Sequence, residues 1–106
     1  MISEAEERIL QLVIQGGDAR CAAMEAIAAA KEGKFGEAAV LLEESGRTLA
    51  HAHRTQTDML QEELQGCREN VSLLMVHAQD HLMNAITVRD LAREMVELYR
   101  KEGNQG

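Results

Sequence analysis

Three side chains in the second half of the chain have the types and the spacing that chemistry requires. His77, Asp80 and His81 lie in the run LMVHAQDHLM of residues 74–83. On a helix, residues three and four positions apart share a face, so the two imidazoles and the carboxylate can act together. The run is otherwise mainly apolar, and burying polar groups costs free energy unless each finds a partner. This cluster is therefore the first candidate for a functional site.

Two kinds of chemistry suit a histidine pair at this spacing. Zinc hydrolases use His-Glu-x-x-His, but Ala78 stands where their glutamate base would be, which argues against a metallohydrolase. A helical bundle that binds a transition metal through His77 and His81 remains an alternative. A neutral imidazole is also a nucleophile near pH 7 and can carry a phosphoryl group as a labile phosphoramidate. Because the sequence has neither a GxxxxGK[ST] nor a GxGxxG loop, such a group would have to arrive on another protein.

The elements that must position this cluster are predicted to be helices. The chain has no proline, one phenylalanine and one tyrosine, and it is rich in strong helix formers. Apolar residues recurring every three to four positions predict helices over about 3–32, 35–64 and 71–101, joined by short loops. We therefore expect residues 1–106 to form one all-α domain, an antiparallel up-down three-helix bundle.

Several local signals refine this prediction. The pair Gly16–Gly17 predicts a kink or short break in the first helix, because glycine is a poor helix former. Gly33 is expected to end that helix in the left-handed conformation. The small pair Ser45–Gly46 is expected to let another helix approach closely. Asn70 is the expected N-cap of the third helix, and the tail 102–106 is expected to fray.

The third helix carries more apolar surface than one pair of neighbouring helices would cover. Beyond its main stripe, a second stripe contains Leu73, Val76, Met83 and Leu91. A chain of 106 residues is also near the size at which partner subunits help to bury surface. We therefore expect part of this helix to face another subunit.

Charge and hydropathy exclude some classes of partner. Eleven Lys and Arg against eighteen Asp and Glu give a net charge of −7, which repels nucleic acid and anionic lipid. The sequence has no apolar run long enough to span a membrane, and its acidic start lacks the basic region of a signal peptide. We therefore expect a cytoplasmic protein without nucleic-acid or membrane contacts.

The two cysteines and the other two histidines are not predicted to take part in catalysis or ligand binding. Cys21 and Cys67 are far apart and form no CxxC pair, which fits reduced thiols. Cys21 is expected in the core and Cys67 in a loop. His51 and His53 are two positions apart, so they point to different sides of a helix and are interpreted as structural residues.

Four segments together resemble one known family. They are VHAQDHLM (76–83), GDAR (17–20), AHRTQT (52–57) and VELY (96–99). The chain resembles the enzyme IIA component of the lactose/cellobiose class of the bacterial sugar phosphotransferase system. The resemblance implies that His77 is the phosphorylated residue. It would accept phosphoryl from phospho-HPr and pass it to a cysteine of the cognate enzyme IIB, within a homotrimer of three-helix subunits.

The resemblance also assigns roles to the neighbours of His77. Asp80 corresponds to a carboxylate on the trimer axis, where three copies hold a divalent cation, usually Mg²⁺. Converging carboxylates repel one another unless a hard cation neutralises them. A local salt bridge or hydrogen bond to His81 is the other interpretation of Asp80. His81 corresponds to a position that can hydrogen-bond in the site, and we expect it to stabilise the phosphoryl group.

Two further expectations concern specificity and the competing class. Some members have glycine where this chain has Ala78, and the Ala78 form favours cellobiose, chitobiose or related sugars over lactose. The competing interpretation is a non-enzymatic, acidic three-helix interaction or regulatory module whose histidines only pack. The exposure of the histidines distinguishes the phosphoryl carrier from the interaction module, because partner proteins must be able to reach a carrier histidine.

Overall fold

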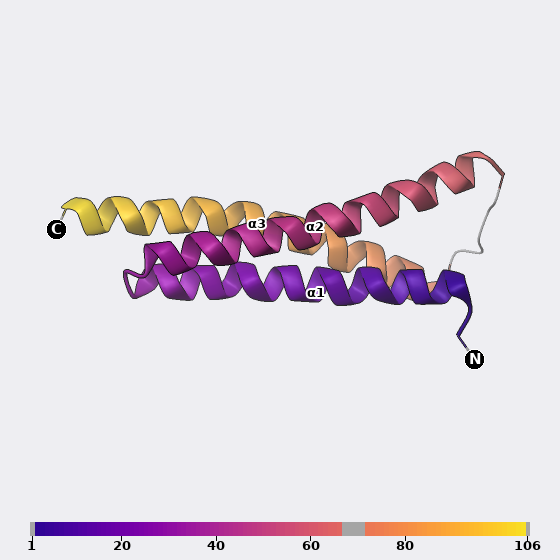
Figure 1. Ribbon diagram of the computed structural model, residues 1–106, viewed down its shortest axis with the longest axis horizontal. Helices are drawn as coiled ribbons and strands as arrows, with labels where there is room; N and C mark the ends of the chain where they lie inside the picture. Colours follow the sequence, from indigo (N-terminus) through magenta and orange to yellow (C-terminus); the bar gives the residue numbers. More distant parts are fainter. Residues whose placement is uncertain (1, 67–71, 106) are drawn as a thin grey trace.

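Three long helices make up the structure, a computed structural model that describes residues 2–66 and 72–105 (Figure 1). They are α1 (Glu4–Lys31), α2 (Phe35–Leu64) and α3 (Leu73–Gln105). The helices run up, down and up in an elongated bundle of 58 × 27 × 19 Å. The predicted all-α, three-helix architecture is confirmed, and the predicted bounds of the second helix are those observed.

The first helix is well defined at both ends and unbroken between them. Ser3 and Glu6 form a reciprocal capping box at its start, with the Glu6 amide donating to the Ser3 hydroxyl at 3.1 Å. Gly33 follows its last turn with φ of 77°, as predicted. The expected kink at Gly16–Gly17 is wrong, because α1 is helical throughout. Its packing against both other helices outweighs the poor helix propensity of two glycines.

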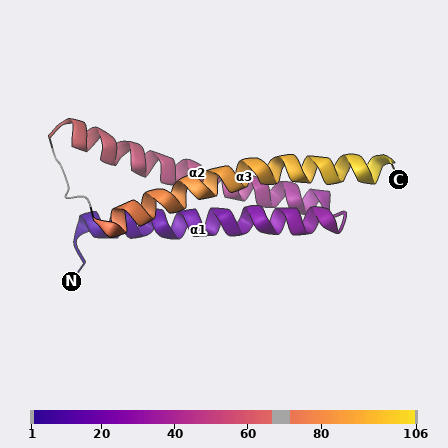
Figure 2. The same cartoon turned by 180° about the vertical axis from the view of Figure 1, so that it is seen from behind.

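The helices contact one another unequally. α1 packs along both α2 and α3, whereas α2 and α3 share a shorter contact and cross near the middle of the molecule (Figures 1 and 2). The core is rich in alanine, whose small side chain lets helix backbones come close together. One buried cluster surrounds the crossing and a second lies under the α1–α2 turn. Their members are Ile9, Leu12, Ala19, Leu49, Ala52, Ala78, Leu82 and Ala85, and then Ala26, Ala29, Ala30, Ala38 and Val96.

The ends of α3 differ from the sequence prediction. The helix begins at Leu73, and the Ser72 hydroxyl accepts a hydrogen bond from the Met75 amide at 3.1 Å. The proposed Asn70 cap and Cys67 both lie outside the described residues. Of the tail 102–106 that was expected to fray, residues 102–105 are helical, because α3 continues to Gln105, and Gly106 lies outside the described residues. A physical reason is the ring of Phe35, which packs against α3 at Gly103.

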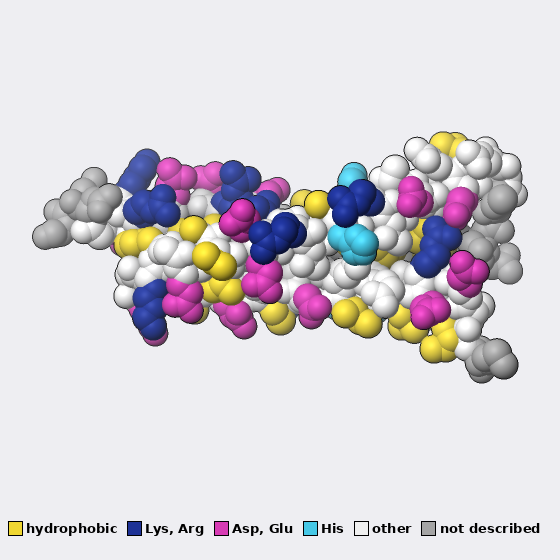
Figure 3. All heavy atoms as spheres, viewed as in Figure 1, with side chains coloured by type: hydrophobic (Ala, Val, Ile, Leu, Met, Phe, Trp, Pro, Cys, Tyr) yellow, Lys and Arg dark blue, Asp and Glu magenta, His cyan; other side chains and the backbone are white. Residues whose placement is uncertain are grey.

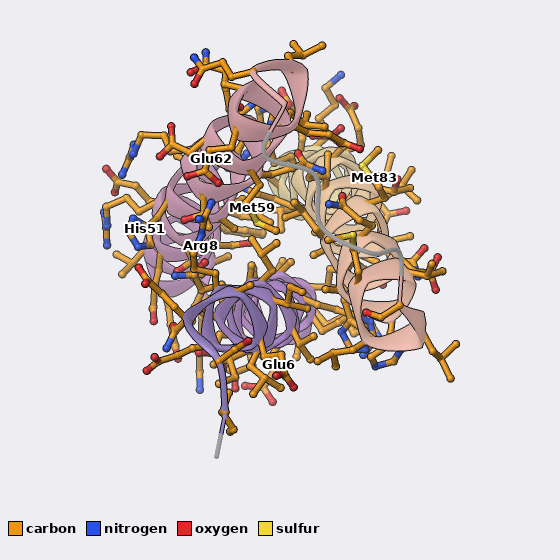
Figure 4. All side chains as sticks on the ribbon, turned by 90° about the vertical axis from the view of Figure 1, so that its right-hand side faces the viewer. Glu6, Arg8, His51, Met59, Glu62 and Met83 are labelled. Carbon is orange, nitrogen blue, oxygen red and sulfur yellow. The ribbon has the colours of Figure 1, made fainter. Side chains whose placement is uncertain are left out.

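The C-terminal half of α2 diverges from α1, and one ion pair spans the gap (Figure 4). Arg8 Nη1 lies 2.9 Å from a carboxylate oxygen of Glu62, and the two side chains point toward each other. Met59 points into the space between the helices, whereas His51 and Met83 point outward from α2 and α3. This end of the bundle is therefore held by an ion pair together with apolar packing.

Acidic and basic side chains are interspersed along the face shown in Figure 3, with apolar side chains between them. Cys21 is exposed, so its predicted core position is wrong. The inward positions of this part of α1 are taken by Ala19, Ala22 and Ala23. No helix in the described part of the chain is long and apolar enough to cross a membrane.

Candidate functional site

The middle of α3 presents different side chains to the core and to solvent. Ala78, Leu82 and Ala85 are buried and fix this stretch against the rest of the bundle. His77 and Asp80 are exposed, and His81 is half-buried. The helix period therefore anchors α3 through its apolar residues and leaves the polar cluster accessible.

The two imidazoles of the cluster are in contact, as the spacing predicted. The ring centroids of His77 and His81 are 4.4 Å apart, and the rings meet edge to face at an interplanar angle of 66°. Because His77 is exposed in the single chain, a partner protein can reach its side chain. The competing interpretation, in which the histidines only pack, requires His77 to be buried.

Asp80 lies on an exposed, mainly apolar stripe of α3, between Val76 and Met83. Positions 73, 76, 80, 83, 87, 91, 94 and 98 follow one another at three- or four-residue steps and so share a face, on which Asp80, Thr87 and Glu94 are the polar members. The large apolar members of this stripe are all at least half exposed: Leu73, Val76, Met83, Leu91 and Leu98. In the described residues, neither a hydrogen bond nor an ion pair joins Asp80 to His81. Residues 2–66 and 72–105 of one chain also offer no cluster of three metal-ligating side chains.

A pair of amides links α2 to this part of α3. The Gln56 side-chain amide donates a hydrogen bond to the Gln79 side-chain carbonyl. Sequence analysis assigned no partner to either residue. Close approach of a helix at Ser45, which was predicted, is observed: Ser45 is fully buried, and its hydroxyl donates to the backbone carbonyl of Ala19 on α1 at 2.8 Å. The sequence did not predict this hydrogen bond.

Gly46, next to Ser45 on α2, leaves room for the side chain of Arg89. A Cβ added to Gly46 would lie 2.6 Å from Arg89 Nη2. The Arg89 guanidinium fills this space and donates from Nε to the carbonyl of Leu42 at 3.1 Å. Gly46 thus admits a side chain of α3, where the sequence predicted close approach of a helix.

His51 and His53 lie outside this cluster on α2. Both are exposed, and His51 Nδ1 is 3.4 Å from Arg54 Nη2. They are not brought to His77, which agrees with leaving them out of the site. Gly16 is the contact residue that sequence reasoning misjudged, because its buried position faces His81. Its spacing of four from Leu12 and three from Ala19, both buried, is the signal that would have identified it.

In the described residues, fold and site together define an all-helical protein that presents an exposed histidine, in contact with a half-buried second one, on its third helix. The sequence model of the "PTS system, Lactose/Cellobiose specific IIA subunit" family matches residues 7–100. The chain therefore belongs to the lactose/cellobiose-specific IIA family of the phosphotransferase system and is a phosphotransferase component.

Individual relatives agree with this membership. The chain is 50% identical over 101 residues to the lichenan-specific phosphotransferase enzyme IIA component of Bacillus subtilis, covering 95% of this chain and 92% of the relative. The crystal structure of the cellobiose-specific enzyme IIA from Bacillus anthracis superimposes with a TM-score of 0.97 at 43% identity, over 100% of this chain and 97% of that one. A chain of the Escherichia coli IIA(Chitobiose)–HPr complex superimposes with a TM-score of 0.83 at 37% identity, over 95% of this chain and 98% of that one.

Proposed function

We propose that this protein carries a phosphoryl group on His77 between phospho-HPr and a cysteine of its cognate enzyme IIB. The observation that carries the proposal is the exposed imidazole of His77, in contact with a second imidazole, on a chain of the IIA family. The similarity to the IIA chain of the IIA(Chitobiose)–HPr complex supports HPr as the donor.

The transfer needs few protein groups. A ring nitrogen of neutral His77 attacks phosphorus, a new P–N bond forms, and the bond between phosphorus and the donor breaks in line. In the second transfer the cysteine thiolate attacks, a P–S bond forms, and His77 is released. His81 lies one turn away and donates a hydrogen bond to a phosphoryl oxygen, which stabilises the negative charge that the group carries.

The oligomeric state proposed is a homotrimer built on the stripe of α3. A contiguous, half-exposed set of large apolar side chains on one helix marks a protein interface. The core of one chain is thin, because alanine dominates it. Association of α3 helices would bury the stripe and leave His77, which lies beside the stripe rather than on it, at the edge of the interface.

A divalent cation, Mg²⁺ in the simplest case, is proposed on the axis of this trimer. Asp80 fits the role because its carboxylate is a hard oxygen ligand on the stripe that the subunits would share, and symmetry would bring three copies together. One chain alone supplies too few ligands in its described residues. The cation would neutralise three carboxylates that otherwise repel one another in the buried interface.

The sugar proposed is a β-linked disaccharide of the cellobiose or chitobiose type. Support comes from the names of the relatives, which are lichenan-specific at 50% identity and cellobiose-specific at 48%, against 41–42% for the lactose-specific components. A galactose-specific relative at 47% lies between them, and the solved structures named for cellobiose and chitobiose add to the support. A phosphoryl carrier need not contact the sugar, so this specificity acts through the choice of enzyme IIB.

Phosphoryl transfer from labelled phosphoenolpyruvate through enzyme I and HPr tests the carrier function. The native chain is expected to take up about one acid-labile, base-stable phosphoryl group per subunit, as a phosphoramidate does. His77→Ala is expected to take up none while remaining folded. His53→Ala is the matched control, since it removes another exposed histidine, and it should label fully. Full labelling of His77→Ala would refute the assignment.

Metal analysis of purified trimer tests the role of Asp80. The native protein is expected to hold about one divalent cation per three subunits, and Asp80→Leu none. The trimer should survive this change, because an apolar contact replaces like charges that require neutralisation. Exposed Asp58, which lies on α2 and so away from the stripe, supplies the control Asp58→Leu. Unchanged metal content in Asp80→Leu would place the cation elsewhere.

A further inference from the structure

α1 makes its closest approach to the histidine cluster at a glycine. Gly16 is buried, and a Cβ added to it would lie 3.3 Å from both the carbonyl carbon and the carbonyl oxygen of His81, and 3.4 Å from His81 Cβ. Such distances are tighter than ordinary van der Waals contact. The backbone of α3 at His81 thus rests directly on the backbone of α1.

Buried residues of α1 one turn before and one turn after Gly16 fix this contact. Leu12 lies one turn before Gly16 and Ala19 one turn after it, and both are fully buried in the core cluster that also contains Leu82. α1 therefore cannot move away from α3 at Gly16 alone without disturbing close-packed neighbours. The absence of a side chain at position 16 sets the distance between the two helices where His81 stands.

The position of His81 in turn determines what its ring can do. The His81 imidazole is half-buried and meets the His77 ring edge to face at 4.4 Å between centroids. A hydrogen bond from His81 to a group carried by His77 requires both rings to be in register. Both rings are on α3, so a local displacement of the backbone at His81 relative to His77, one turn before it, changes that register.

We propose that Gly16 is a positioning residue of the phosphoryl-transfer site, which fixes His81 against His77 through the α1–α3 contact. The inference rests on the proposed function, in which His77 carries the phosphoryl group. Glycine is among the poorest helix formers, so its use at a buried position in the middle of a 28-residue helix fits a requirement for close approach.

Gly17 provides a matched control for this proposal. It occupies the next position of the same helix, and a Cβ added to it would meet nothing within 4 Å. Gly16→Ala and Gly17→Ala therefore remove the same backbone freedom and add the same methyl group. Only the first adds that methyl group against His81.

The experiment compares the two variants with the native full-length protein. The first readout is the single-turnover rate of phosphoryl acceptance from phospho-HPr. Misplacement of about 1 Å costs about 100-fold in rate, and the methyl group requires a shift of a few tenths of an ångström, so Gly16→Ala should be about 3- to 10-fold slower. Gly17→Ala should keep the native rate. Equal rates for the two variants would overturn the proposal.

The second readout is the NMR ring signals of His77 and His81 without phosphoryl group. These signals should shift in Gly16→Ala and stay in place in Gly17→Ala, which a general loss of stability would not produce. Nuclear Overhauser contacts between Gly16 Hα and His81 Hβ of the native protein test the contact without any variant. Their absence would overturn the proposal even if Gly16→Ala failed to fold.

A double-mutant cycle tests whether Gly16 acts through His81. In a His81→Gln background, adding Gly16→Ala should cause no further loss of rate, because the ring that it positions is gone. An additional loss equal to that seen in the native background would refute this route. Failure of the native protein to become labelled at His77 would refute the proposed function instead. The NMR measurements would still test the contact between Gly16 and His81.

Discussion

Shortening one side chain of the α3 stripe is expected to weaken the trimer without unfolding the subunit. Leu91 is 54% exposed in the single chain. Complete burial of a leucine is worth about 1.5–3 kcal/mol, so roughly half of that, about 1 kcal/mol, remains to be gained on association. Three subunits lose about 3 kcal/mol together in Leu91→Ala, which weakens the trimerisation constant about 100-fold.

Sedimentation equilibrium over a range of protein concentrations measures this effect. The native protein should sediment at three times its chain mass of 11.7 kDa, and Leu91→Ala should dissociate at concentrations where the native trimer is intact. Leu60 is the matched control, because it is a leucine of nearly equal exposure, 52%, on α2. If Leu91→Ala associates as tightly as the native protein, or if Leu60→Ala weakens association equally, the stripe is not the interface.

Two further substitutions test the core. Leu82→Ala removes a fully buried side chain beneath the histidine cluster and should lower the free energy of unfolding by about 2–5 kcal/mol in urea denaturation; a change below about 1 kcal/mol would mean that the site collapses or is not close-packed. Ser45→Ala removes the buried hydrogen bond to the Ala19 carbonyl and should cost about 1 kcal/mol by the same measurement. A stabilised Ser45→Ala protein would show that this bond contributes nothing.

Family membership and the site cluster could both be predicted from short-range patterns. Residues at three- and four-residue spacing meet on any helix, so the contact between His77 and His81 follows from the sequence once that segment is helical. The approximate bounds of the first two helices, the left-handed Gly33 and the exposure of the second stripe follow from local propensity and periodicity in the same way.

What failed were predictions that depended on which neighbour each face would meet. Cys21 fits an apolar pattern but faces solvent, because neighbouring alanines already fill the inward positions of α1. Gly103 belongs to a tail that local propensity makes weak, yet α3 continues past it where the ring of Phe35 packs.

Gly16 shows the physical reason most directly. Local propensity treats a glycine in a helix only as a weakness, and by that measure the first helix should bend. In the tertiary structure α1 remains helical through Gly16. The absence of a side chain at Gly16 lets the backbone of His81 pack closely against α1. The sequence by itself determined the three helices, the histidine pair and the family. Only the packing of α1 against α3 brought Gly16 to the backbone of His81, because contacts between residues 65 positions apart are not encoded in any local spacing.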